Sequence, residues 1–94
     1  MNYLMMLWVG LGLAACAAQP PVQEMAAARA SVHMAKTLAH EHHMPVPALQ
    51  SAEQALQQAA QDIQQQHYQR ARSKALQAKR KAQAIVRHIQ HTHQ

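Results

Sequence analysis

The chain has 94 residues and a formal charge of +5, with one cysteine, no phenylalanine and two glycines. A chain of this length forms one small domain at most, and its core contributes little net stability. A single cysteine cannot pair within the chain, so an intrachain disulfide is excluded. Alanine and glutamine favour helix over strand, and we expect an all-α fold.

The N-terminal part of the chain has the pattern of an export signal. An uncharged apolar run covers residues 3–13. It has the length of a signal-peptide hydrophobic region and is shorter than the ~20 residues of a membrane-spanning helix. An uncleaved membrane anchor is the alternative interpretation. The run leads into small residues that end in the cysteine: Leu13, Ala14, Ala15 and Cys16.

These four residues resemble a lipobox, the processing signal of bacterial lipoproteins. The resemblance implies cleavage of residues 1–15, a diacylglycerol on the Cys16 thiol and an acyl group on the new amino end. Two or more acyl chains hold a protein stably at a bilayer, whereas one is marginal. Ala17 resembles the residue that follows the cysteine in outer-membrane lipoproteins. We therefore expect an outer-membrane anchor with the body on the periplasmic face.

Prolines divide the remaining chain into helices. Proline fits the first turn of a helix and keeps the residue before it out of the helical conformation. After a tether over residues 16–22, Pro21 thus favours one helix start, Pro45 an end and Pro47 the next start. A glutamine-rich stretch, residues 64–67, marks a second turn. We expect a helical domain over residues 23–94, with helices at about 22–43, 47–64 and 67–91.

Apolar residues recur at alternating spacings of three and four in each segment, which predicts one buried stripe per helix. Three helices with short connections pack as a small up-down-up antiparallel bundle. Alanine stripes bury little area, so we expect marginal stability. The first stripe contains Met25, Ala28, Val32, Ala35 and Ala39, widened by Met34 and Leu38; the second contains Leu49, Ala52, Leu56, Ala59 and Ile63; the third contains Tyr68, Ala71, Ala75, Ala78, Ala82, Ile85 and Ile89.

Two motifs in these helices carry a family resemblance. Pro47-Ala48-Leu49 precedes spaced alanines, and Tyr68 precedes a series of alanines at spacings of three and four. From about Met25 to Ala84 the chain resembles an uncharacterised family of Ala-rich bacterial envelope lipoproteins. Some members carry this module ahead of an outer-membrane-protein-A-like, peptidoglycan-binding domain.

The turn between the second and third helices departs from the family pattern. Gln66-His67 stands where the family has Gly-Asp, and glutamine does not adopt positive φ as readily as glycine. A two-helix hairpin, in which the second and third helices are continuous, is therefore the alternative fold. The family has no assigned activity, so the resemblance implies none.

Positive charge is concentrated in the last third of the chain, which has no acidic residue after Asp62. A basic helix binds anionic polymers or surfaces. Export argues against nucleic acid, so the expected partners are the membrane surface, peptidoglycan or another envelope protein. A solvated helix face is the alternative. The candidate basic face contains Arg70, Arg72, Lys74, Lys79, Arg80, Lys81 and Arg87.

Histidines form two clusters near the expected ends of the first and third helices. An up-down-up bundle places both clusters at the same end, and imidazole with thioether sulfur binds copper, zinc or nickel. Solvated helix ends are the alternative. The candidate ligands are His40, His42, His43, His88 and His91, with Met44 and His93 beside them.

Enzymatic chemistry has little support in the sequence. Lipidation would consume the only thiol, and Ser31, Ser51 and Ser73 have no evident base and orienting group. We also expect no concave apolar surface that would form a substrate pocket. The sequence predicts a non-enzymatic structural or interaction module of the cell envelope without a cofactor. A periplasmic metal-binding lipoprotein is the alternative.

Overall fold

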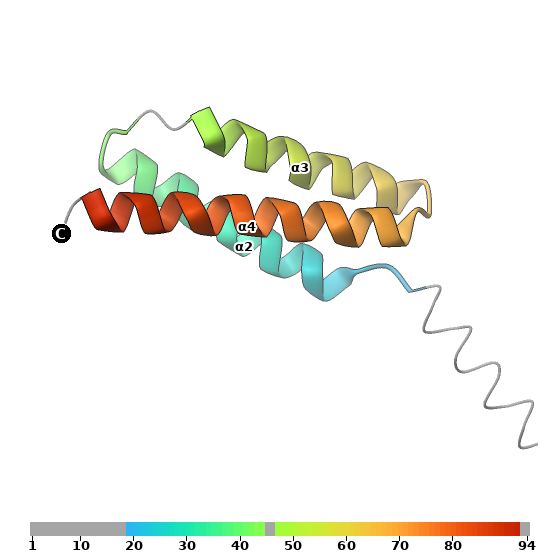
Figure 1. Cartoon of the computed structure of the whole chain (residues 1–94). Coiled ribbons are helices and arrows are strands. Elements are labelled where there is room, and N and C mark those ends of the chain that lie inside the picture. The colour runs from blue at the N-terminus through green and yellow to red at the C-terminus, as the bar shows by residue number, and fades with distance from the viewer. Residues whose placement is uncertain (1–18, 45–46, 93–94) are drawn as a thin grey trace, which may run out of the picture.

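The computed structural model describes residues 19–44 and 47–92. These residues form three helices and no strand: α2 (Val22–Glu41), α3 (Pro47–Gln64) and α4 (Tyr68–Thr92) (Figure 1). Consecutive helices run in opposite directions and pack against one another (Figure 1), which confirms the predicted all-α three-helix bundle. The signal segment, the lipobox and the Pro45-Val46 stretch lie outside the described residues.

Both described turns end a helix through the same hydrogen-bond pattern. At the end of α2, the Met44 N–H donates to the Ala39 carbonyl oxygen at 3.0 Å, and the His43 N–H donates to the His40 carbonyl oxygen at 3.2 Å. His43 has a φ of 52°, so this is a Schellman motif with a left-handed residue after the cap. Helix α2 therefore ends at Glu41, two residues before the expected end.

The turn between α3 and α4 repeats this pattern. The His67 N–H donates to the Asp62 carbonyl oxygen at 2.7 Å, the Gln66 N–H donates to the Ile63 carbonyl oxygen at 3.0 Å, and Gln66 has a φ of 64°. Glutamine thus takes the position that the sequence argument reserved for glycine, because the two hydrogen bonds offset the unfavourable conformation. The chain breaks between α3 and α4, and the alternative of one continuous helix is wrong.

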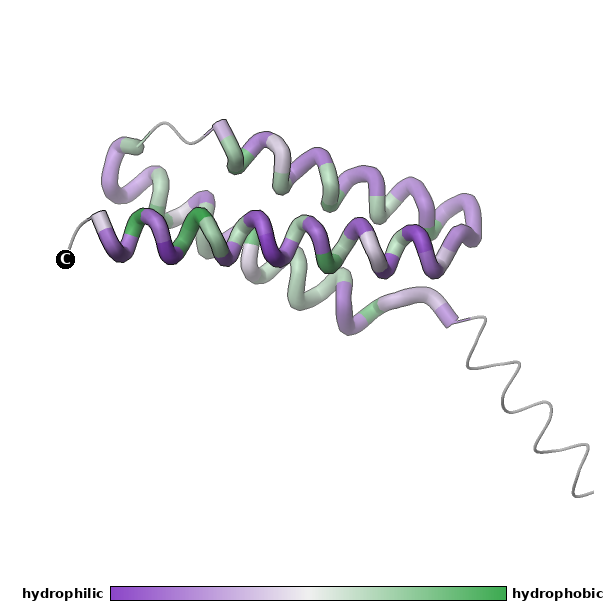
Figure 2. The backbone as a smooth tube through the Cα atoms, viewed as in Figure 1, coloured by the Kyte–Doolittle hydropathy of each residue, from purple (hydrophilic) through white to green (hydrophobic). Residues whose placement is uncertain are grey.

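The core is built mainly from alanine. Five α2 residues and six α4 residues of the expected stripes are buried, and Tyr68 is half-buried. Along every helix, hydrophobic residues recur among hydrophilic ones turn by turn (Figure 2). The fully buried alanines, with no exposed surface, are Ala28, Ala35, Ala52, Ala59, Ala71, Ala75, Ala78 and Ala82.

The α3 stripe is rotated relative to the prediction. Ala55 and Asp62 are buried, whereas Leu49, Leu56 and Ile63 are only half-buried at the edge of the core. Alanines on the contact line let α3 approach α4 closely, and the larger side chains then lie beside that line, since interhelical distance depends on the side chains at the contact.

Helix α4, which is 25 residues long, is the shared packing partner of the bundle. It packs extensively against both α2 and α3, whereas α2 and α3 contact each other much less. The α2 residue Met34, expected to widen the core, is instead 56% exposed. Helices α2 and α3 are therefore the most loosely packed pair of the bundle.

We expect a larger side chain among the buried alanines of α4 to destabilise the bundle. Ala78→Leu should lower the free energy of unfolding by roughly 1–3 kcal/mol, because Ala78 is fully buried and an added side chain overpacks the contact. Ala84→Leu on the exposed side of α4 should change it by less than about 0.5 kcal/mol. Urea unfolding followed by circular dichroism measures both; equal stability of the two variants would contradict tight alanine packing.

Candidate functional site

The seven basic residues of α4 are distributed around the helix rather than gathered on one face. Arg72, Lys79 and Arg87 line hollows beside α2. Lys81 contacts α3, and helical periodicity places Arg70 and Lys74 on that same side of α4. Arg80 is exposed. The packing of α4 between two helices therefore divides this charge between two flanks.

The α3 flank is closed by a hydrogen bond between helices. The Lys81 ammonium donates to the Ser51 hydroxyl oxygen at 2.6 Å, in a partly buried position. A serine beside a lysine is also a pair used by some hydrolases. Both residues lie within helices, where the backbone N–H groups are engaged in helical hydrogen bonds and supply no oxyanion site. We assign this pair a structural role.

Removing the hydroxyl should therefore weaken the bundle. Ser51→Ala leaves the partly buried Lys81 ammonium without this acceptor and should lower the free energy of unfolding by about 1 kcal/mol. Ser73→Ala, which truncates an exposed serine of α4, is the matched control. Chemical unfolding of both variants measures the difference, and identical midpoints would show that the hydrogen bond contributes nothing.

One ion pair links α4 to α2. Arg72 Nε lies 3.4 Å from Glu24 Oε1, and the two side chains are 46% and 44% exposed. Exposed pairs contribute little to stability. Among the described residues, Arg72 is the one basic residue of α4 that is paired with a carboxylate, so most of the positive charge on this helix has no acidic partner.

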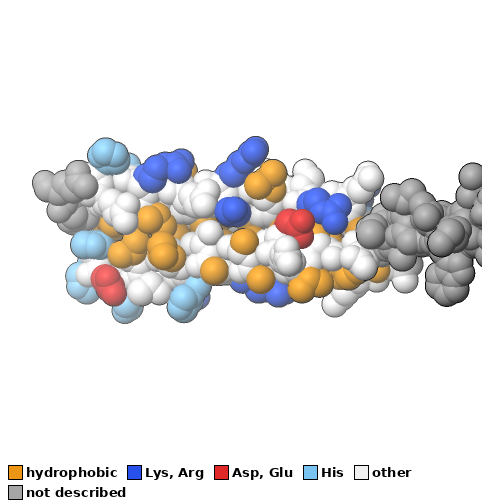
Figure 3. Space-filling view, turned by 90° about the horizontal axis from the view of Figure 1, so that it is seen from below, with side chains coloured by type: hydrophobic (Ala, Val, Ile, Leu, Met, Phe, Trp, Pro, Cys, Tyr) orange, Lys and Arg blue, Asp and Glu red, His pale blue; other side chains and the backbone are white. Residues whose placement is uncertain are grey.

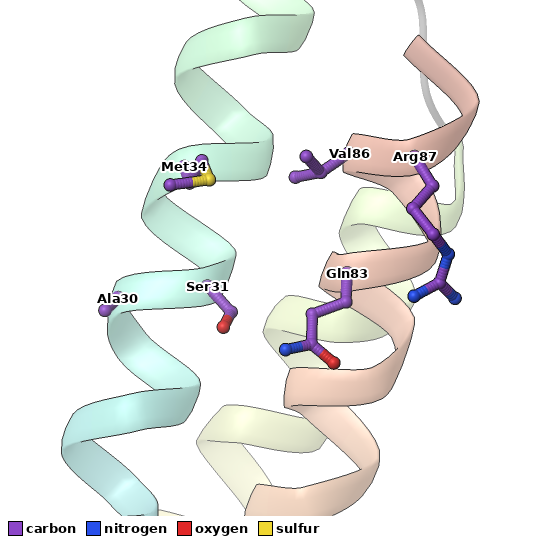
Figure 4. A pocket seen from close by; sticks show the side chains of 6 residues that line it. All are labelled: Ala30, Ser31, Met34, Gln83, Val86 and Arg87. Carbon is purple, nitrogen blue, oxygen red and sulfur yellow. The ribbon is translucent and has the colours of Figure 1, made fainter. Parts of the chain in front are cut away.

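The α2 flank is open and hollowed. One hollow of about 400 Å³ is bounded by Ala30, Ser31 and Met34 of α2 and by Gln83, Val86 and Arg87 of α4 (Figure 4). A second, of about 360 Å³, lies towards the start of both helices and includes Ala27, Leu76 and Lys79. We call these two hollows together the α2–α4 groove. The expectation that the domain lacks a concave apolar surface is therefore wrong.

Figure 4 shows how side chains line the first of these hollows, the one next to Met34. Ser31 points from α2 towards α4, and Gln83 and Val86 extend from α4 towards α2 (Figure 4). In the space-filling view, hydrophobic side chains form a band with Lys and Arg side chains beside it (Figure 3). Sequence reasoning did not find this groove. Its signal was Leu76, an apolar residue outside the predicted stripes, together with Met34 at the widened edge of the first stripe.

Most histidines visible in Figure 3 lie at one end of the bundle, as the up-down-up topology requires. His40 and His43 border a hollow there with Met44. Among residues 19–44 and 47–92, however, no three or more His, Cys, Asp or Glu side chains are grouped so that they could hold a metal ion. His93 lies outside the described residues. Within the described part of the chain, the candidate ligands near the ends of α2 and α4 thus lie at one end of the bundle without forming a group that could hold a metal ion.

Two further observations bear on the class of protein. No helix in the described part of the chain is both long and apolar enough to cross a bilayer. No protein-family model, curated protein or solved structure matches the chain. The resemblance to the Ala-rich envelope family therefore stays a prediction from the sequence.

Proposed function

We propose that this protein is an outer-membrane-anchored periplasmic lipoprotein that acts as a non-enzymatic interaction module of the cell envelope. The anchor is the lipid on Cys16, inferred from the lipobox-like sequence of residues 13–16. The module is the helical domain, and its partner-binding element is α4. The partner is an envelope protein or an anionic polymer such as peptidoglycan.

The observation that carries this proposal is the unpaired positive charge of α4. Seven Lys and Arg residues occur along one helix, and only Arg72 is paired with a carboxylate among the described residues. Charge that is not used within the fold remains available for attraction to an acidic partner, which speeds association and selects against basic surfaces. The hydrophobic band beside this charge adds apolar surface that a bound partner would remove from water.

Lipidation tests the anchor. Cells grown with labelled palmitate should incorporate the label into the wild-type protein and not into Cys16→Ser, because the thiol is the group that receives the diacylglycerol and the amino end is acylated only after that step. The Cys16→Ser protein should also move from the membrane fraction to the soluble fraction. An acylated, membrane-bound Cys16→Ser protein would exclude the proposed lipoprotein.

Site-specific photocrosslinking in cells tests the interaction module. A crosslinking amino acid at Gln83 or Gln77, both exposed on α4, should capture a discrete envelope partner because α4 carries the unpaired charge. The same amino acid at Gln57, exposed on α3, is a control that replaces another glutamine. A product from either α4 position supports the assignment. A product from Gln57 alone would place the binding surface on α3 and contradict the assignment to α4.

A further inference from the structure

We propose that the α2–α4 groove binds an acidic amphipathic helix presented by another protein. This inference rests on the proposed function, since it names the kind of partner that the interaction module would take. It follows from three properties of the groove, which are its exposed apolar side chains, its length and its charge.

Two of the three exposed large apolar side chains among the described residues border the groove. Met34 is 56% exposed and Leu76 is 42% exposed, and both border the groove from opposite helices. Val86, which borders the groove beside Met34, is half-buried and packs against the core. Ala27 and Ala30 border the two hollows on the α2 side, and their small side chains leave room there for a partner's side chains. An apolar partner surface would remove Met34 and Leu76 from water.

The spacing of these side chains fits a helix. Leu76 and Val86 are ten positions apart on α4, which corresponds to about 15 Å along a helix axis. A partner helix of about three turns lying along the groove spans this distance. It would present apolar residues at i, i+3 or i+4, i+7 and i+11, as helices bound in grooves do. The bound helix would lie against α2 and α4 as a fourth helix of the bundle.

The charge of the groove selects an acidic helix. Lys79 and Arg87 border it, and neither is paired with a carboxylate among the described residues. Glu24, which borders the second hollow, the one that includes Leu76 and Lys79, already contacts Arg72. Asp or Glu residues beside the apolar stripe of a partner would therefore meet unpaired cations on α4, and a basic helix would be repelled.

The same properties argue against two other occupants. A second copy of this chain, docked groove to groove, would bring Lys79 and Arg87 near their own equivalents, and the only acidic residues in the whole chain are Glu24, Glu41, Glu53 and Asp62. A flat anionic membrane attracts basic residues on any exposed side of α4, including Arg70 and Arg80, and does not fill a groove.

Peptide binding to the full-length lipoprotein in neutral detergent micelles tests this inference. The probe is a labelled synthetic helix of roughly 18 residues, long enough to form a helix, with leucines at i, i+3, i+7 and i+11 and glutamates on the flanks. Fluorescence anisotropy should show saturable binding. The same peptide with lysine in place of glutamate should bind at least about tenfold more weakly, because its flanks face Lys79 and Arg87.

Paired variants separate the groove from overall charge. Lys79→Glu with Arg87→Glu should weaken binding about tenfold or more, whereas Arg70→Glu with Arg80→Glu, the same change of net charge outside the groove, should weaken it less than about threefold. Met34→Gln with Leu76→Gln should also lose about tenfold, whereas Val22→Gln, at an apolar residue that is 68% exposed, should not. Circular dichroism establishes that each variant keeps its helices.

The outcomes are distinct. Equal weakening by the two charge-reversed pairs would mean diffuse attraction and would overturn the groove, as would equal binding of the acidic and basic peptides. Binding of the protein to anionic vesicles with no binding of the acidic peptide would assign the surface to a membrane instead. If the peptide fails to bind while Cys16-dependent acylation and the α4 crosslink persist, the groove inference fails and the proposed function stands.

Discussion

Close contact between alanines on α4 and its two neighbours is the interaction on which this structure depends. Ala75, Ala78 and Ala82 are fully buried on α4, opposite fully buried alanines of the other helices. Small side chains let helix axes approach more closely than leucines do, so dispersion contacts between backbones replace part of the missing hydrophobic area. A chain without phenylalanine or a disulfide can form a defined bundle in this way, although each contact contributes little.

This arrangement gives the two flanks of α4 different roles. On the α3 side, Lys81 bonds to Ser51 and ties the helices together. On the α2 side, Lys79 and Arg87 border a groove that also exposes Met34 and Leu76. One basic helix thus supplies both a structural contact and an uncovered surface. Reversing the charge of Lys81 would disturb the fold together with any binding, so it is a poor probe of function, whereas the groove residues are good ones.

Features set by local sequence could be predicted. The stripes of α2 and α4 followed from periodicity, and the helix count followed from prolines and a polar turn. Features set by packing between helices could not. The spacing of three and four predicted an α3 stripe that includes Leu49, Leu56 and Ile63 besides Ala52 and Ala59. The two alanines are buried as predicted, but the three larger residues lie at the edge of the core. The positive φ of Gln66 depends on a hydrogen-bond pattern that glutamine does not signal. The basic residues were identified, but their division between two flanks, and the groove beside them, appear only once α4 is placed between its neighbours.

Amide hydrogen exchange of the native protein, residue by residue, tests most directly whether α4 is the shared packing partner. Because α4 packs against both other helices while α2 packs mainly against α4, amides at the centre of α4, around Ala78 and Ala82, should exchange only through global unfolding. Amides of α2 should exchange faster, through openings that detach this helix alone. Protection in α2 equal to or greater than that at the centre of α4 would contradict this account of the fold.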